Sequence, residues 1–168
     1  MKIIGIDPGS TRIGFSCVAK KTLKQGGVKL LSCGLLPIKQ KNFGDRLLEA
    51  QRLLSRLIKK NSPDLFSIEK IYFGKNRKTA LEIAHFRGVL ILEAIRNKIK
   101  VVEYSPNEVK LTITGYGLSD KKAVARMITK ILKLKKPPTP DDVTDAIALA
   151  LTAIYRQKFS ALSVGVDK

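Results

Sequence analysis

Four acidic residues are candidates for chemistry, because each lies where a strongly basic chain has no structural need of an acid. Asp7 and Glu69 each end a short apolar run of the kind that forms a buried strand, and Asp142 and Asp145 begin a helical stretch. The spacing of the last two puts both side chains on one face of that helix. Carboxylates from strand ends and from a facing helix form an oxygen cage that suits hard divalent cations. The four residues therefore predict a metal site.

The charge of the chain indicates what such a site would act on. The sequence has 32 Lys and Arg residues against 14 Asp and Glu residues, a formal net charge of +18. An excess of this size favours a polyanionic partner, and the lack of a long apolar span favours nucleic acid over a membrane. Two Mg²⁺ ions about 3.5–4 Å apart can hold the attacking and leaving oxygens of a phosphoryl displacement. We therefore expect metal-assisted cleavage of a phosphate backbone, with Mn²⁺ as a substitute for Mg²⁺.

A purely structural explanation exists for each acid taken singly. Asp7 could belong to a turn, Glu69 could pair with a lysine, and the helix acids could stabilise the positive end of the helix dipole. The neighbouring Asp141 is an extra acid, which could be a ligand in place of Asp142 or the helix N-cap, with Thr139 as another candidate cap. The structural explanation is weaker for the whole set, because Glu69 ends an apolar strand.

The loop that follows Glu69 combines two adjacent aromatic residues with polar and cationic ones. Aromatic rings can stack on an unpaired base while cations hold the phosphates. The alternative is that one of the two aromatic residues packs in the core. The loop residues expected to contact nucleic acid are Tyr72, Phe73, Lys75, Asn76, Arg77 and Lys78.

Two further lysines flank a flexible Gly-Tyr-Gly turn at 115–117, namely Lys110 and Lys121. Either could steady the scissile phosphate or the charged transition state. Lys121 and Lys122 begin a basic helical stretch over 120–134, for which Ser119 is the expected N-cap. A run of charge is usually a solvated helix face, but this one follows a glycine hinge and precedes the acidic pair, which favours a role towards phosphates.

The remaining sequence predicts the elements that must position these residues. Apolar runs and turn signals predict strands at 2–7, 13–18, 28–38, 65–69 and 100–104. Helical periodicity predicts helices at 43–60, 78–98, 106–109, 120–134 and 141–157. Alanines in the last helix keep it slim enough to approach the sheet closely. This order is typical of one α/β domain with a mixed sheet, spanning 1–157, followed by a basic, flexible tail at 158–168.

Cysteine usage and the N-terminus indicate a cytoplasmic protein. Cys17 and Cys33 are the only cysteines, and both are expected to be buried free thiols in a reducing compartment. They could face each other if their strands form a hairpin. The N-terminal apolar run is short and interrupted by Asp7, unlike a signal peptide.

Several stretches match one known family when taken together in this order. They are IGIDPGSTRIGF at 4–15, PDLFSIEKIYFGKN at 63–76, HFRGV at 85–89, VVEYSPNEVKLTITGYGLSDKKAV at 101–124 and DDVTDAIALA at 141–150. From residue 2 to about 155, the chain resembles the RuvC family of Holliday-junction resolvases. This resemblance implies an RNase H-like fold, here a mixed five-stranded sheet flanked by helices.

The resemblance also implies a Mg²⁺-dependent homodimer that nicks two opposing strands of a four-way DNA junction symmetrically. In this family the acids at 7, 69, 142 and 145 would bind the metal and Lys110 and Lys121 would be basic residues near the site, with Lys121 counted among the catalytic residues. Tyr72 falls where the family often has a Phe that contacts unpaired bases, and Phe73 could share that role. The helix over 81–95 would form the dimer face, and a branch-migration motor complex would be a partner.

Two other functions remain alternatives. The chain could be an RNase H-like nuclease for another branched or hybrid nucleic acid, or a non-catalytic junction-binding protein. Four intact acids argue against a pure binder, since carboxylates repel DNA phosphates. A sugar-kinase or actin-like phosphotransferase is excluded, because that fold needs a duplicated domain and a second glycine-rich phosphate loop.

Overall fold

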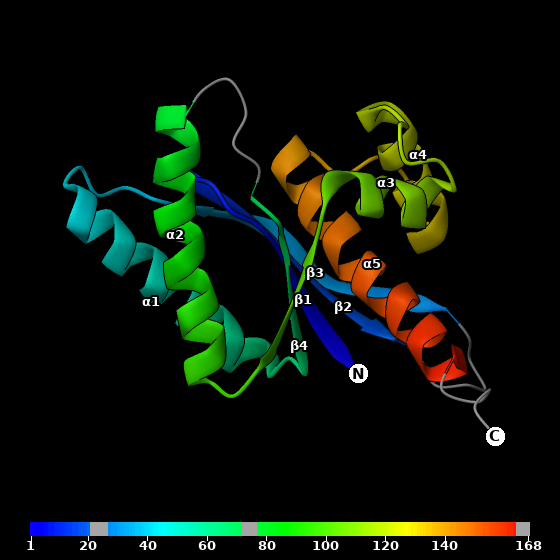
Figure 1. Ribbon diagram of the computed structural model, residues 1–168, viewed down its shortest axis with the longest axis horizontal. Coiled ribbons are helices and arrows are strands. Elements are labelled where there is room, and N and C mark those ends of the chain that lie inside the picture. Colours follow the sequence, from blue (N-terminus) through cyan, green and yellow to red (C-terminus); the bar gives the residue numbers. More distant parts are fainter. Residues whose placement is uncertain (21–26, 72–76, 164–168) are drawn as a thin grey trace.

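Helices cover both faces of a five-stranded sheet (Figure 1). The computed structural model describes residues 1–20, 27–71 and 77–163, apart from the side chains of residues 77, 78 and 157–163. The strands are β1 (Lys2–Asp7), β2 (Arg12–Lys20), β3 (Val28–Pro37), β4 (Leu65–Glu69) and β5 (Lys100–Tyr104). The helices are α1 (Phe43–Asn61), α2 (Arg77–Arg96), α3 (Pro106–Thr114), α4 (Lys121–Leu132) and α5 (Asp141–Ser163).

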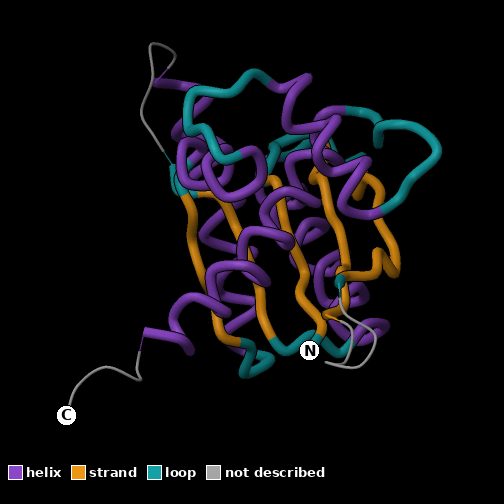
Figure 2. The backbone as a smooth tube through the Cα atoms, turned by 90° about the vertical axis from the view of Figure 1, so that its right-hand side faces the viewer, coloured by secondary structure: helices purple, strands orange, loops and turns teal. Residues whose placement is uncertain are grey.

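The sheet is mixed, as the sequence predicts, with the strand order β3-β2-β1-β4-β5. The first three strands form an antiparallel meander, while β4 runs parallel to both β1 and β5. Helices α1 and α2 lie on one face and α3, α4 and α5 on the other (Figures 1 and 2). In the described part of the chain, no helix has both the length and the apolar character needed to span a membrane.

Strand alternation divides the core into two layers. In β1, Ile4 and Ile6 pack towards α1 and α2, whereas Ile3 packs towards α3, α4 and α5. In β4, Phe66 likewise faces the first layer and Leu65 the second. Because successive side chains of a strand point to opposite faces, the odd-numbered residues of β1 and β4 share the face that α5 covers.

Helix α5 packs unusually close to the sheet. A Cβ atom on Gly5 would lie 2.1 Å from the carbonyl oxygen of Ala146, so only glycine fits there. Two buried strand hydroxyls bind the helix directly: Ser16 Oγ donates to the Ala146 carbonyl and Ser67 Oγ to the Leu149 carbonyl, each at 2.9 Å. The alanines of α5 keep the helix slim where it meets the sheet, as the sequence predicts.

Helix α3 is longer than the expected segment 106–109. Ser105 and Glu108 form a complete capping box at its start, and the helix continues until Gly115, whose φ of 81° ends it. Nothing before Gly115 stops the helix, so the early end predicted from the sequence is wrong.

The N-cap residue predicted for helix α4 is also wrong. The helix is capped by Asp120 rather than by Ser119, because the backbone N–H of Ala123 donates to Asp120 Oδ1 at 2.6 Å. The hydroxyl of Ser119 instead lies 2.7 Å from that of Thr114, which ties the turn back to α3.

Helix α5 begins at Asp141, as predicted, but its cap and its end differ from expectation. Its first backbone N–H bonds go to the carbonyl of Pro140, so neither Asp141 nor Thr139 is the capping residue. The helix continues to Ser163, past the predicted end at Gln157, and so takes in part of the segment expected to be a tail.

The two cysteines do not face each other. Cys33 pairs with Ser16 in the β2–β3 ladder and Cys17 pairs with Ser32, so the two side chains point to opposite faces of the sheet. Both thiols are free, and Cys17 is buried as expected. Cys33 is exposed, because β3 is an edge strand, and the prediction of its burial is wrong.

Candidate active site

Asp7 and Glu69 lie side by side at the ends of adjacent parallel strands. The β1–β4 register pairs Ile6 with Ile68, so the next residue of each strand stands at the same edge of the sheet. Alternation turns both carboxylates to the face that α5 covers. The two acids predicted from strand ends are therefore brought together.

The acidic pair of α5 reaches the same edge. A Cβ atom on Gly14 of β2 would lie 2.1 Å from the carbonyl oxygen of Asp142, so the first turn of α5 rests directly on the sheet. Gly14 itself pairs with Asp7 in the β1–β2 ladder. Asp142 and Asp145 thus approach Asp7 from the face of the sheet that α5 covers. All four predicted acids lie at one edge of the sheet, although three separate elements carry them.

Burial and mutual repulsion act on this cluster. Burial is the main cause that raises the pKa of Asp7 to about 8, and the carboxylates of Asp145, Glu69 and Asp142 add to it. Burial also raises the pKa of Glu69, with Asp145 as the next cause. Burial likewise raises the pKa of Asp145. Crowded, partly desolvated carboxylates of this kind hold their charge only beside cations.

The cluster suits a divalent cation in its chemistry. Asp142 Oδ2 is buried and has no hydrogen-bond donor among the described residues. Arg12 lies beside it. Its Nη2 is 2.9 Å from Oδ2, in an ion pair without the alignment of a hydrogen bond. Its Nε donates to Oδ1 at 3.3 Å. Within the described residues, no three acids are already drawn together into a metal-ligating group, so an ion would have to draw these carboxylates inwards.

Asp142 rather than Asp141 faces the cluster. The side chain of Asp141 is 79% exposed and that of Asp142 is 22% exposed. Asp142 also contributes to the raised pKa of Asp7. Asp141 stands at the rim, where its carboxylate lies 3.5 Å from the ammonium of Lys121.

Lys121 supplies a positive charge at the acidic cluster. Its Nζ donates to Asp145 Oδ2 at 3.4 Å, and the charge of Asp145 is the main cause that raises the pKa of the lysine. A cleft of about 320 Å³ is lined by Lys110 and Lys121 together with Glu69 and Asp145. The two lysines predicted to act near the phosphate are therefore both beside the acids.

Lys122 lies in a neighbouring cleft. That cleft of about 570 Å³ is lined by Lys122, Arg126, Asp141 and Asp145, among others. It adjoins the first cleft through Lys121 and Asp145. A more apolar cleft lined by Leu111, Ile131 and Tyr155 contains none of the four acids, and we assign it no part in the chemistry.

The aromatic loop falls mostly outside the described residues. Tyr72, Phe73, Lys75 and Asn76 are not described, and Arg77 and Lys78 begin α2 without described side chains. What the structure gives is the origin of the loop: it leaves β4 directly after Glu69, and the N–H of Lys70 still donates to the Tyr104 carbonyl at 2.9 Å.

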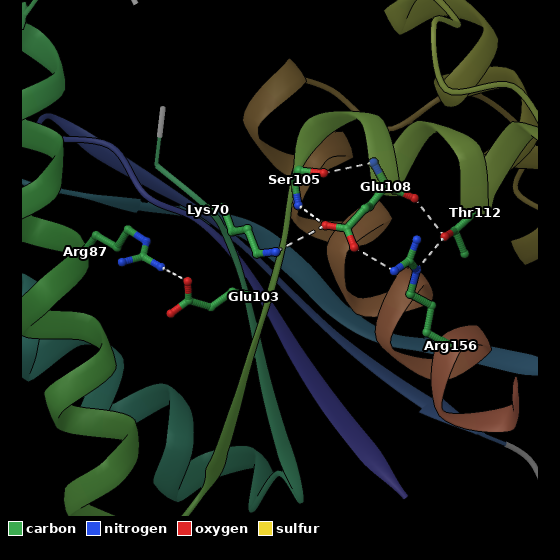
Figure 3. Close-up of polar contacts among 7 residues, drawn as sticks. All are labelled: Lys70, Arg87, Glu103, Ser105, Glu108, Thr112 and Arg156. Carbon is green, nitrogen blue, oxygen red and sulfur yellow. Dashed lines mark hydrogen bonds and ion pairs between the residues drawn. The ribbon is translucent and has the colours of Figure 1, made fainter. Parts of the chain in front are cut away.

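Two arginines near the acids were missed by sequence reasoning. Arg12 pairs with Asp142 across 130 residues of sequence, and its only local signal is its place just after the Asp7 turn. Arg87 donates from Nε to the backbone carbonyl of Glu69 at 2.9 Å and pairs with Glu103 (Figure 3). A single cation inside the otherwise apolar stretch 86–92 was the available signal for Arg87.

Comparisons with known proteins point to one family. The family model described as crossover junction endodeoxyribonuclease RuvC matches residues 3–153. A curated protein of that name from Prochlorococcus marinus is 38% identical over 158 residues, covering 94% of this chain and 100% of the relative. One from Ruminiclostridium cellulolyticum is 40% identical over 168 residues, covering 100% and 99%. The structure of Thermus thermophilus RuvC in complex with a Holliday junction substrate superposes with a TM-score of 0.88, at 27% identity, covering 95% of this chain and 96% of that one.

Proposed function

Because this chain belongs to the RuvC family of crossover junction endodeoxyribonucleases, we propose that it resolves four-way DNA junctions by paired symmetric nicks. The observation that carries the proposal is the placement of Asp7, Glu69, Asp142 and Asp145 at one edge of the sheet, with the pKa of Asp7 raised to about 8. Such a cluster in a chain of net charge +18 suits hydrolysis of a polyanion.

Those four acids are the residues we assign to metal binding. The enzyme is a divalent-metal nuclease by family, and we take Mg²⁺ as the metal, with two ions per site and Mn²⁺ as a substitute. When bound, the metal lowers the pKa of water and neutralises charge on the leaving oxygen. Oδ2 of Asp142, which accepts no hydrogen bond from the described residues, and the crowded carboxylate of Asp7 are suitable ligands.

Lys121 and Lys110 act on the phosphate in this proposal. Both line the cleft that contains Glu69 and Asp145, where ammonium groups can stabilise charge that develops on the scissile phosphate. Lys122 and Arg126 continue the positive surface along α4 and would hold a DNA arm. Contacts of this type release counterions, so binding weakens steeply with salt.

The loop after Glu69 is proposed to contact the unpaired bases at the crossover. Its candidate residues are Tyr72, Phe73, Lys75, Asn76, Arg77 and Lys78. Aromatic stacking tolerates any base, while the cations hold the backbone. Because the loop leaves β4 beside Glu69, a base stacked on it would hold the neighbouring phosphate close to the acids.

Paired nicks need two sites, and α2 offers the surface for a homodimer. Leu81, Leu92 and Ile95 of α2 are each more than half exposed, at 55%, 57% and 57%. Their spacings of 11 and 3 residues place them on one stripe of the helix, and such a stripe favours a partner. We further propose a cytoplasmic location, one nuclease domain and association with a branch-migration motor.

Cleavage of an end-labelled four-way junction tests the proposal. The junction is compared with linear duplex, flap and RNA–DNA hybrid, in Mg²⁺ or EDTA, for the wild type and Asp7→Asn. We expect paired symmetric nicks in the junction alone, abolished by EDTA and by the substitution. Cleavage of flap or hybrid instead would point to the alternative nuclease, and binding without cleavage to a junction-binding protein.

A further inference from the structure

We propose that Arg46 and Arg87 are positioning residues that hold the backbones behind the metal-binding acids against helix α2. The inference rests on the proposed function, because it takes Asp7 and Glu69 as metal ligands. Through these two arginines, α2 supports both β1 and β4, whose ends must stay in register with each other. Neither arginine touches a carboxylate of the acidic cluster, so both act through the main chain.

Arg87 braces the end of β4. Its side chain comes from α2 and is 15% exposed. Nε donates to the carbonyl oxygen of Glu69 at 2.9 Å, and Nη2 forms an ion pair with Glu103 of β5 (Figure 3). One guanidinium thus ties together α2, β5 and the residue that carries a candidate ligand. A planar fork can satisfy two acceptors at once, which a lysine ammonium cannot do with the same geometry.

Arg46 braces the turn after β1 in the same way. Its side chain comes from α1 and is 18% exposed. Nη2 donates to the carbonyl of Ser10, in the turn that follows Asp7, and Nη1 lies 2.8 Å from the carboxylate of Glu82 on α2. Its guanidinium also lies over the ring of Phe86, 5.3 Å from the centroid. The turn that begins at Asp7 is therefore fixed to the same helix as Glu69.

Support from one helix should keep Asp7 and Glu69 in position to bind a metal. Metal ligands must be held within roughly 0.5 Å of their working positions, by groups that are themselves held. Asp7 and Glu69 end different strands, and their carboxylates repel each other and Asp145. Two part-buried guanidiniums bonded to backbone carbonyls resist that repulsion without placing a competing charge among the ligands. Loss of either brace should therefore weaken metal binding more than it weakens folding.

Arg156 provides a matched control. It also forms an ion pair between elements, with Glu108 at 2.7 Å (Figure 3). Its guanidinium lies over an aromatic ring, that of Tyr104, 5.6 Å from the centroid. Its side chain is 35% exposed, and its hydrogen bonds go to Glu108 and Thr112 rather than to the backbone of an acid or its turn. Breaking this pair disturbs stability through similar chemistry but removes no hydrogen bond to the backbone of Glu69 or of the turn after Asp7.

The test measures Mn²⁺ binding by the full chain without DNA, from the loss of the free Mn²⁺ signal in electron paramagnetic resonance. The variants are Arg87→Gln, Arg87→Lys, Arg46→Gln and Arg156→Gln, each with a thermal unfolding curve. We expect Arg87→Gln and Arg46→Gln to weaken Mn²⁺ binding by about 10-fold or more, as loss of an outer support does at metal sites. Arg156→Gln should bind Mn²⁺ as the wild type does, whatever its melting temperature, and Arg87→Lys should recover part of the affinity.

Junction cleavage gives the second measurement. In Arg87→Gln and Arg46→Gln, kcat should fall while KM for the junction is unchanged. A higher Mn²⁺ concentration should restore part of kcat. The proposal is overturned if Mn²⁺ affinity stays at the wild-type value in both variants, or if Arg156→Gln loses as much. Should Arg87→Gln not fold, Arg87→Lys and Arg46→Gln decide it. A wild type that binds Mn²⁺ but cuts no junction would sink the proposed function, while leaving the comparison of affinities valid.

Discussion

Gly14 of β2 lies directly beneath the backbone of Asp142, so close that a Cβ atom on Gly14 would be 2.1 Å from the Asp142 carbonyl oxygen. No side chain fits in that space, and the neighbour is rigid helix backbone. The acidic pair of α5 reaches Asp7 because this contact, together with the one at Gly5, lets the helix lie against the strands.

Gly14→Ala should therefore push the first turn of α5 away from the sheet. We expect the free energy of unfolding to fall by about 1–3 kcal/mol, which is the usual effect of overpacking. The rate of junction cleavage should fall by more than this loss of stability accounts for. Urea unfolding and cleavage rates check both expectations. Gly34→Ala is the control, since its Cβ would meet only the ring of Phe15, at 3.2 Å. Equal effects of the two substitutions would contradict the role given to the Gly14 contact.

Asp7 should make the stability of the metal-free protein depend on pH. Its folded-state pKa of about 8 lies above the ordinary aspartate value of 3.8, so between these values the folded chain keeps a proton that the unfolded chain has released. The free energy of unfolding therefore falls as pH rises through this range.

Thermal unfolding in EDTA at about pH 5 and about pH 8, two values within this range, checks the pH prediction. The loss of melting temperature should be larger in the wild type than in Asp7→Asn, which cannot ionise. Asp45→Asn, at an exposed position of α1, is the control and should behave as the wild type does. Parallel curves for the wild type and Asp7→Asn would show that Asp7 is not the group responsible.

Lys121→Ala should slow the chemical step. The ammonium lies 3.4 Å from Asp145 and lines the cleft that contains Glu69, so its loss removes charge stabilisation from the transition state. We expect kcat to fall by about 100-fold or more, with a much smaller change in KM for the junction. Lys59→Ala, on α1 at the opposite face of the sheet, serves as the control for the loss of one positive charge. A change in KM alone would make Lys121 a residue for DNA affinity only.

Leu92→Glu should separate the proposed dimer. A charge on the exposed stripe of α2 would have to be buried against the partner, which costs far more than leaving it in water. We expect a monomer in light scattering, and single rather than paired nicks in the junction. Leu31→Glu, on the exposed edge of β3, should leave the oligomeric state unchanged. Dimers in both variants would remove α2 from the interface.

Much of the site follows from local periodicity in the sequence. Apolar runs ending in Asp7 and Glu69 predict strands, and alternation within each strand decides which face each acid takes. The three-residue spacing of Asp142 and Asp145 decides that they share a helix face. These regularities come from backbone geometry over a few residues, so they were predicted correctly without knowledge of the fold.

Competing local signals were the source of the errors. Ser119 and Asp120 are both good N-cap residues, and the contact of Ser119 with Thr114 decides between them. Cys33 reads as a buried strand residue, but β3 is an edge strand, and that is a property of strand order. In each case a contact or a strand order that the local pattern does not contain made the choice.

The sequence by itself determined the acids and the element order, because strand and helix periods are set by the chain's own geometry. Only the tertiary structure decided that Asp142 rather than Asp141 faces inwards, that Arg12 pairs with it, and that Arg46 and Arg87 hold the backbones behind Asp7 and Glu69. These contacts join elements far apart in the chain. They depend on how closely α5 and α2 pack on the sheet, and no local pattern encodes that distance.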